Sequence, residues 1–141
     1  MKASELNLNI HALLEVKCAH IYITRNIVIV EIQKHTNLGK KEMMCILDAI
    51  ERNCPDLSNM HYISNRTEIY SLKPIELVEM KGRIDQFKSY SVVNYESAGD
   101  TNLVFERMFL KKEIVKYSSL VNAIRATKSS HLKVKNDSRV A

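Results

Sequence analysis

The chain has 141 residues, enough to bury the core of one domain, and its 45% hydrophobic and 26% charged residues are typical of a globular protein. The formal net charge of +5 is unevenly placed, because residues 128–141 hold four cationic side chains against one carboxylate. A nucleic-acid-binding domain usually carries its basic face on the folded body, so this distribution argues against nucleic acid as a partner.

The three cysteines, Cys18, Cys45 and Cys54, are odd in number and widely spaced, which does not suit a disulfide framework. We expect Cys18 on a strand and Cys45 on a helix, as small buried hydrophobic residues. Free thiols suit a reducing compartment. No run approaches the roughly 18 apolar residues of a membrane span, and residues 1–7 lack the apolar core of a signal peptide. The sequence therefore predicts a cytoplasmic protein with no membrane span.

In chain order, the first clear elements are two strands at about 18–24 and 26–33. Both are rich in β-branched residues and the residues between them are polar, which predicts a hairpin. Residues 1–17 are expected to form either an N-terminal extension or an additional edge strand. The reason is an alternation of apolar residues, at Leu6, Leu8 and Ile10.

A helix is predicted over residues 38–53. Asn37 is the expected N-cap, because its side chain can accept from the exposed amides of the first turn, and Pro55 ends the helix. A short strand is expected next, over residues 60–64. The helix prediction depends on apolar residues at helical spacing, namely Met43, Ile46, Leu47, Ile50 and Cys54.

The second half of the chain continues this alternation. Pro74 suits the first turn of a short helix that ends near Gly82. The remaining predicted elements are a strand at 90–95, a helix at 99–110, a strand at 114–117 and a helix capped by Ser119.

The resulting order is β-β-α-β-α-β-α-β-α. It predicts an α/β domain over residues 18–127, with a mixed sheet that is mostly parallel beyond the hairpin and helices packed on it. Residues 128–141 have no apolar periodicity and are predicted to be a flexible basic tail.

The best-placed polar residues are Ser64, Asn65 and Arg66, directly after the apolar strand that begins near Met60. In open α/β sheets, functional loops lie beyond the carboxyl ends of the strands. We therefore predict a partner or ligand surface there. An alternative is purely structural: Ser64 and Asn65 bond to the loop backbone, and Arg66 pairs with a carboxylate such as Glu68. The predicted surface consists of Ser64, Asn65, Arg66, Tyr70 and Ser71.

Two serines of this segment, Ser71 and Ser64, are candidate phosphosites. A phosphate on Ser71 would add about −1.5 to −2 charge beside a helix start, where the helix dipole favours anions. The alternative is an ordinary capping or turn serine.

Motifs for catalysis and cofactors are missing from the sequence. The five histidines show neither HExxH nor an i, i+4 pair, and no P-loop or GxGxxG occurs among only three glycines. No nucleophile–base pair or paired-carboxylate motif can be read from the chain. We therefore expect no metal, no cofactor and no enzymatic activity.

The element order, the hairpin and three segments together resemble a known family. These segments are residues 62–66 (Tyr-Ile-Ser-Asn-Arg), residues 105–109 (Phe-Glu-Arg-Met-Phe) and residues 119–124 (Ser-Leu-Val-Asn-Ala-Ile). The chain resembles, over about residues 18–127, the small STAS-like (SpoIIAA-like, anti-sigma-factor-antagonist-like) proteins of Bacteroidetes-type bacteria. The most specific part is Ile-Ser-Asn-Arg with the following Tyr-Ser-x-x-Pro.

The resemblance implies a non-enzymatic bacterial protein of the SpoIIAA-like fold that regulates by protein–protein interaction. Anti-sigma-factor antagonists are phosphorylated by a partner kinase within an Asp-Ser-Ser/Thr-Gly motif. This chain lacks that motif, and Ser71 is the nearest counterpart in position.

Two functions remain open at this stage. The first is a regulatory module, switched by phosphorylation, that docks on a regulator or kinase through the loop 64–74 and the following helix. The second is a small-molecule or lipid carrier that holds an apolar ligand between the sheet and a movable helix. The short, irregular helix at 75–84 motivates the second. A homodimer would form if an edge strand of the hairpin or N-terminus paired with a second copy.

Overall fold

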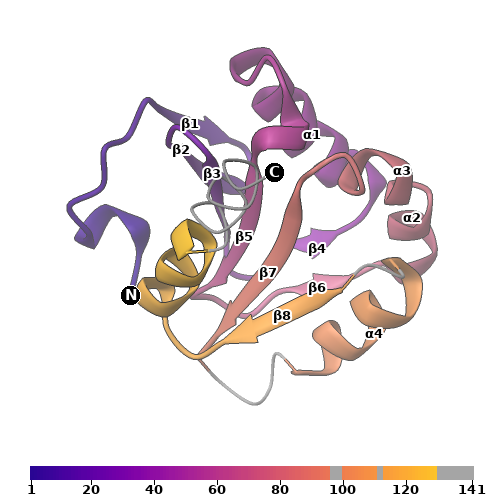
Figure 1. Ribbon diagram of the computed structural model, residues 1–141. Coiled ribbons are helices and arrows are strands. Elements are labelled where there is room, and N and C mark those ends of the chain that lie inside the picture. Colours follow the sequence, from indigo (N-terminus) through magenta and orange to yellow (C-terminus); the bar gives the residue numbers. More distant parts are fainter. Residues whose placement is uncertain (96–99, 111–112, 130–141) are drawn as a thin grey trace, which may run out of the picture.

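The computed structural model describes residues 1–95, 100–110 and 113–129. Its centre is a mixed six-stranded sheet with the strand order β1-β2-β3-β5-β7-β8 (Figure 1). The first three strands are antiparallel, and the neighbours from β3 to β8 are parallel, which confirms the predicted hairpin and parallel half. The strands are β1 Ala12–Val16, β2 Ala19–Ile23, β3 Ile27–Ile32, β5 His61–Arg66, β7 Ser89–Asn94 and β8 Ile114–Tyr117.

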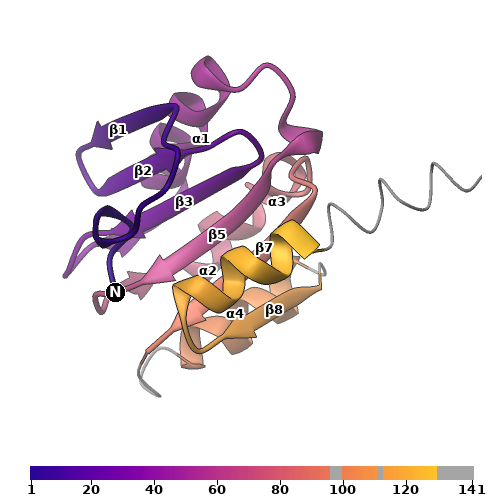
Figure 2. The same ribbon diagram turned by 60° about the vertical axis from the view of Figure 1, so that its left-hand side comes forward.

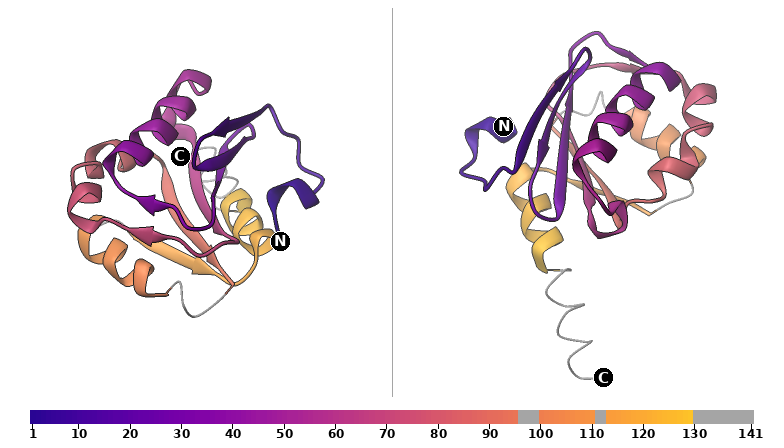
Figure 3. Two further views of the ribbon diagram at one scale, coloured as in Figure 1. Left: turned by 180° about the vertical axis from the view of Figure 1, so that it is seen from behind. Right: turned by 90° about the horizontal axis from the view of Figure 1, so that it is seen from above.

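Four helices, α1 to α4, cover one face of this sheet, and a helix over 120–129 covers the other face with the N-terminal segment (Figure 3). Each predicted helix exists, although the one predicted from Pro74 is divided into α2 and α3. The helices are α1 Lys40–Asn53, α2 Pro74–Val78, α3 Lys81–Ile84 and α4 Asp100–Leu110. The short elements are the 3-10 turns Ala3–Glu5 and Leu57–Asn59 and the strands β4 Asn37–Leu38 and β6 Ser71–Leu72, which pair in parallel.

The continuous apolar run in β3 has a direct cause, because the strand is buried on both faces. Val28 and Val30 belong to the core beneath α1–α4, whereas Ile27 and Ile29 belong to the core beneath the 120–129 helix. Figure 2 shows that helix in yellow in front of the sheet, on the half that holds β5, β7 and β8. β1 lies at one edge of the sheet and β8 at the other.

The start of α1 differs from the prediction. Asn37 is not the N-cap, because residues 37–38 form β4, and the N-cap is Gly39, which makes no side-chain capping bond. The amide of Lys40 instead donates to Oε1 of Glu76 at 3.1 Å, so a carboxylate from α2 supplies the cap. The side chain of Asn37 accepts from the hydroxyl of Ser71 at 3.0 Å.

The N-terminal region contains both an edge strand and a packed extension. The edge strand is β1, and the alternating Leu6 and Leu8 pack on the sheet face instead of forming a strand. Cys45 is exposed, so its predicted burial was wrong; it lies outside the apolar face of α1. Cys18 is half-buried in the turn between β1 and β2 and not on a strand. The predicted basic tail lies outside the described residues from position 130 onward.

Candidate functional site

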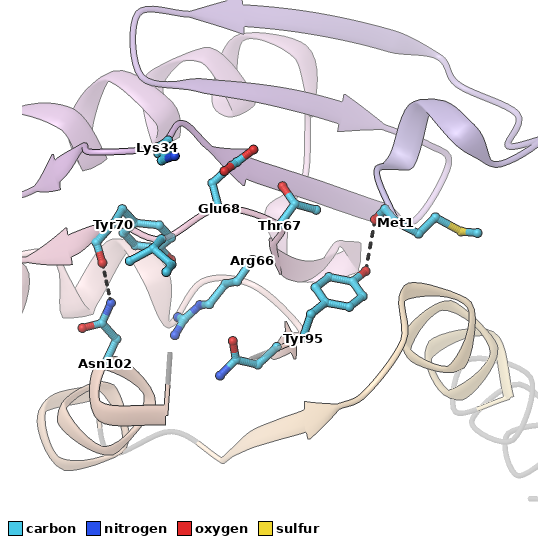
Figure 4. A pocket seen from close by; sticks show the side chains of 10 residues that line it. Met1, Lys34, Arg66, Thr67, Glu68, Tyr70, Tyr95 and Asn102 are labelled. Carbon is cyan, nitrogen blue, oxygen red and sulfur yellow. Dashed lines mark hydrogen bonds between the residues drawn. The ribbon is translucent and has the colours of Figure 1, made fainter. Parts of the chain in front are cut away.

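A polar cavity of about 520 Å³ lies where β5 and β7 end (Figure 4). Arg66 is the last residue of β5, Asn94 is the last residue of β7, and Lys34 follows β3. The cavity therefore occupies the carboxyl edge of the parallel strands, where ligands of open α/β sheets bind. It is lined by Met1, Lys34, Arg66, Thr67, Glu68, Ile69, Tyr70, Asn94, Tyr95 and Asn102.

Backbone hydrogen bonds join the two loops on one side of this cavity. The amide of His35 donates to the carbonyl of Ile69 at 3.1 Å, and the amide of Ser71 donates to the carbonyl of Thr36 at 3.0 Å. His35 has a φ of 66°, a left-handed conformation that is uncommon for residues other than glycine. These contacts fix the turn after β3 against the loop after β5.

Arg66 belongs to a buried polar network that joins β5 to α4. Its Nη2 forms an ion pair with Oε1 of Glu106, and its Nε donates to the hydroxyl of Ser64 at 3.3 Å. The hydroxyl of Tyr90 donates to Oε2 of Glu106 at 2.9 Å. The guanidinium carbon lies 5.8 Å from the ring centroid of Tyr70. The carboxylate that pairs with Arg66 is therefore Glu106 and not the predicted Glu68.

The electrostatics of this network favour a charged arginine beside neutral phenols. Burial, followed by the nearby Glu106, raises the pKa of Tyr90 well above its ordinary value. Burial also raises the pKa of Tyr70, although the Arg66 cation opposes this. Burial acts to lower the pKa of Arg66, but Tyr70 and Glu106 outweigh it and the net direction is upward. Tyr90 thus remains a donor to Glu106 at neutral pH.

Asn65 faces the opposite side of the sheet and holds the N-terminal segment. Its Nδ2 donates to Oε2 of Glu31 at 2.6 Å and to the carbonyl of Met1 at 2.9 Å. The hydroxyl of Tyr95 lies 2.9 Å from Oδ1 of Asn65 and 3.0 Å from the Met1 carbonyl. The same Glu31 oxygen accepts from the amide of Ala3 at 2.7 Å. Asn65 therefore contributes to the position of one wall of the cavity without lining it.

The structure corrects the predicted exposed surface around Ser64, Asn65 and Arg66. All three side chains are buried because β5 continues through Arg66 instead of ending at Ser64. Tyr70 is also buried, whereas Ser71 is exposed. Of these five residues, Arg66 and Tyr70 line the cavity.

Several residues of the site were not predicted from the sequence. Glu106 was recognisable from the sequence, because its carboxylate falls on the buried stripe of α4, between Leu103 and Leu110, where a charge needs a buried partner. Asn94 and Tyr95 repeat the pattern of a polar strand end and were also recognisable. Nothing in the sequence marked Lys34 or Asn102, since their position depends on how the turn after β3 and the start of α4 pack.

A second feature is an apolar surface on two neighbouring helices, α2 and α4, which contact each other. Ile75 on α2 is 83% exposed and Met108 on α4 is 64% exposed. Phe105 on α4 lines a small apolar cavity together with Pro74 and Leu77, which places it beside α2. We call this region the α2–α4 surface; it comprises Ile75, Val78, Val104, Phe105 and Met108.

Three further observations bear on the type of protein. Across residues 1–95, 100–110 and 113–129, no group of three or more His, Cys, Asp or Glu side chains is placed to hold a metal ion. No helix within the described part of the chain is long and apolar enough to span a membrane. Comparison of the chain with protein-family models, with curated proteins and with solved structures gave no match.

Proposed function

We propose that this protein is a non-enzymatic, STAS-like regulatory module that docks on a protein partner through the α2–α4 surface. The exposed apolar side chains of that surface are the observation that carries the proposal. Large exposed apolar patches on soluble domains commonly mark interaction sites. The SpoIIAA-like assignment is supported by the order of elements over residues 18–127, and a cytoplasmic setting by three cysteines that form no disulfide.

The chemistry of the surface suits a protein partner with an apolar contact face. The charged residues beside α2 are already paired within the chain: Lys40 lies 2.9 Å from Glu79, and Lys73 lies 3.9 Å from Glu76. An apolar centre with a compensated polar rim is the usual composition of a protein interface. The partner in this proposal is a regulator or a kinase.

Ser71 is the favoured phosphosite for switching this docking. It is exposed, donates its hydroxyl hydrogen to Asn37 and lies three residues before α2. A phosphate there would remove the donor and place about two negative charges beside the surface, which would oppose apolar docking. α2 has only five residues, so its dipole adds little to this effect. Ser64 is only 3% exposed, and a kinase would not reach it without unfolding β5.

The test is capture of the partner from a lysate of the source organism with matched variants. The double variant Ile75→Asp/Met108→Asp places charge on the α2–α4 surface, and Leu13→Asp places it at a position on β1 that is 55% exposed. We expect one stoichiometric protein to bind the wild type and Leu13→Asp but not the double variant, and the purified protein to reproduce this binding. A phosphomimetic Ser71→Glu variant should weaken the interaction.

Two results would overturn the proposal. One is that no captured protein depends on the α2–α4 surface. The other is sedimentation of the wild type as a dimer that only the Ile75→Asp/Met108→Asp variant dissociates, which would assign the surface to a second copy of the chain. Dissociation by Leu13→Asp alone would instead indicate pairing through the edge strand β1.

The carrier alternative has weaker support. The apolar cavity beneath α2, lined in part by Leu38, Leu77 and Tyr90, has a volume of about 20 Å³. This is near the minimum for a single water molecule, so a lipid would require α2 to move away from the sheet. Native mass spectrometry that finds a co-purified apolar molecule would favour this function.

A further inference from the structure

The polar cavity beyond β5 and β7 has features of a ligand site that the docking function does not use. Its volume of about 520 Å³ falls within the range of roughly 300–1,000 Å³ that is usual for small-molecule sites. The α2–α4 surface is built on other residues, although Asn102, in the first turn of α4, lines the cavity. The residues that line the cavity can therefore bind a small molecule while the α2–α4 surface binds a protein.

Arg66 provides the strongest indication of ligand chemistry. Its side chain is only 4% exposed, and Nη2 and Nε are engaged by Glu106 and Ser64. Among the residues that the structure describes, its Nη1 has no hydrogen-bond partner. A buried donor without an acceptor destabilises the folded state, and a ligand oxygen would remove that cost. Figure 4 shows Arg66 lying between Tyr70 and Tyr95 in the cavity.

Two further charged groups define what the ligand would carry. Lys34, on the turn after β3, is an exposed cation that lines the same cavity and would attract an anionic group. Glu68 lines it as well and accepts hydrogen bonds only, so it matches a hydroxyl group. The amide nitrogen of Asn102 is already used, since it donates to the carbonyl of Tyr70 at 2.9 Å, and its oxygen remains an acceptor.

We propose that this cavity binds a small hydroxylated organic anion. Its carboxylate or phosphate group accepts from Nη1 of Arg66 and from Lys34, and its hydroxyl groups donate to Glu68 and Asn102. Arginine suits this role because its planar fork fits the oxygens of either group. Carboxylate and phosphate ligands share this chemistry, and the experiment separates them.

The experiment is an NMR titration of the ¹⁵N-labelled full-length protein with four probes: inorganic phosphate, acetate, glycerol 3-phosphate and malate. We expect saturable shifts of the Arg66, Thr67, Tyr95 and Asn102 amides. The hydroxylated probe of one class should bind more tightly than the simple anion of that class, which identifies phosphate or carboxylate as the preferred group. Absence of saturable shifts with all four probes would overturn the proposal.

Variants assign the binding to this cavity. Lys34→Glu should weaken binding of the best probe about tenfold or more, whereas Arg25→Glu makes the same charge change on the exposed turn between β2 and β3 and should have no effect. Equal weakening by both variants would show non-specific attraction and overturn the proposal. A second variant, Arg66→Met/Glu106→Leu, removes the ion pair as a unit and should abolish binding. Lys34→Glu tests the site without touching the buried pair.

Discussion

Arg66 at the end of β5 and Glu106 in the middle of α4 form a buried ion pair between residues 40 positions apart in the chain. Their side chains are 4% and 7% exposed, so neither charge is well solvated. The pair joins the central sheet to a helix that carries part of the exposed apolar surface. It also positions the guanidinium that lines the polar cavity.

Removing one partner of this pair should be far more damaging than removing both. Glu106→Leu leaves the Arg66 cation buried without its counterion, and we expect a loss of about 3–5 kcal/mol in the free energy of unfolding. Arg66→Met/Glu106→Leu should recover most of that loss, because a buried ion pair replaced by apolar side chains is often close to neutral. Urea denaturation of the three proteins measures this difference. A single-variant loss below about 1 kcal/mol would contradict the buried pair.

Local sequence patterns were sufficient to predict most of the fold. Burial within or against the sheet requires apolar side chains at regular positions, and the sequence shows these positions directly. This holds for the β-branched residues of β2 and β3 and for the helical spacing of Met43, Ile46 and Ile50. The end of β5 was predicted too early because polar side chains are unusual inside a buried strand. Arg66 is accommodated there because α4 supplies Glu106 as its counterion.

The site depended on relationships that periodicity does not contain. Arg66 was selected from the sequence, but its partner lies on an element whose packing is determined by the whole domain. The same holds for Asn65, whose acceptor Glu31 comes from β3. The predicted N-cap of α1 was wrong for a similar reason. Asn37 is the nearest polar residue in the sequence, whereas the carboxylate of Glu76 reaches the start of the helix from α2.

His35 should tolerate glycine better than valine. Its φ of 66° costs an ordinary residue roughly 1 kcal/mol, and glycine avoids that strain. His35→Gly keeps the backbone bond to Ile69 and should change the free energy of unfolding by less than about 0.5 kcal/mol or increase it. His35→Val should lower it by about 1–2 kcal/mol, because β-branched residues fit this conformation poorly. Thermal unfolding of both variants compares them, and equal stabilities would contradict the strain.

Gly39 and Glu76 should be energetically coupled. A Cβ atom added at Gly39 would lie 2.6 Å from Oε1 of Glu76, the atom that caps Lys40. Gly39→Ala should therefore displace the cap, and Glu76→Ala should remove it, each at about 0.5–2 kcal/mol. The double variant should cost less than the sum, since the cap is lost only once. A double-mutant cycle by urea denaturation measures the coupling, and strict additivity would show that the contact is unimportant.

Three buried tyrosines, Tyr62, Tyr70 and Tyr90, should make the fold sensitive to alkaline pH. Burial is the largest cause that raises the pKa of each above its ordinary value, so the folded protein keeps these phenols neutral. The stabilisation is complete below about pH 10, where the unfolded chain is also neutral, and is lost as pH rises and only the unfolded chain ionises. Three such groups imply a slope of about 4 kcal/mol per pH unit above pH 10.

Tyrosinate absorbance recorded together with circular dichroism tests this expectation. Of the six tyrosines in the chain, these three should ionise only as the secondary structure is lost. Tyr62→Phe keeps a ring stacked on Tyr90, where the two centroids lie 4.8 Å apart, but removes one ionising group. Its stability should therefore fall less steeply with pH than that of the wild type. Reversible ionisation of all six tyrosines near pH 10 with unchanged circular dichroism would contradict the buried network around Glu106.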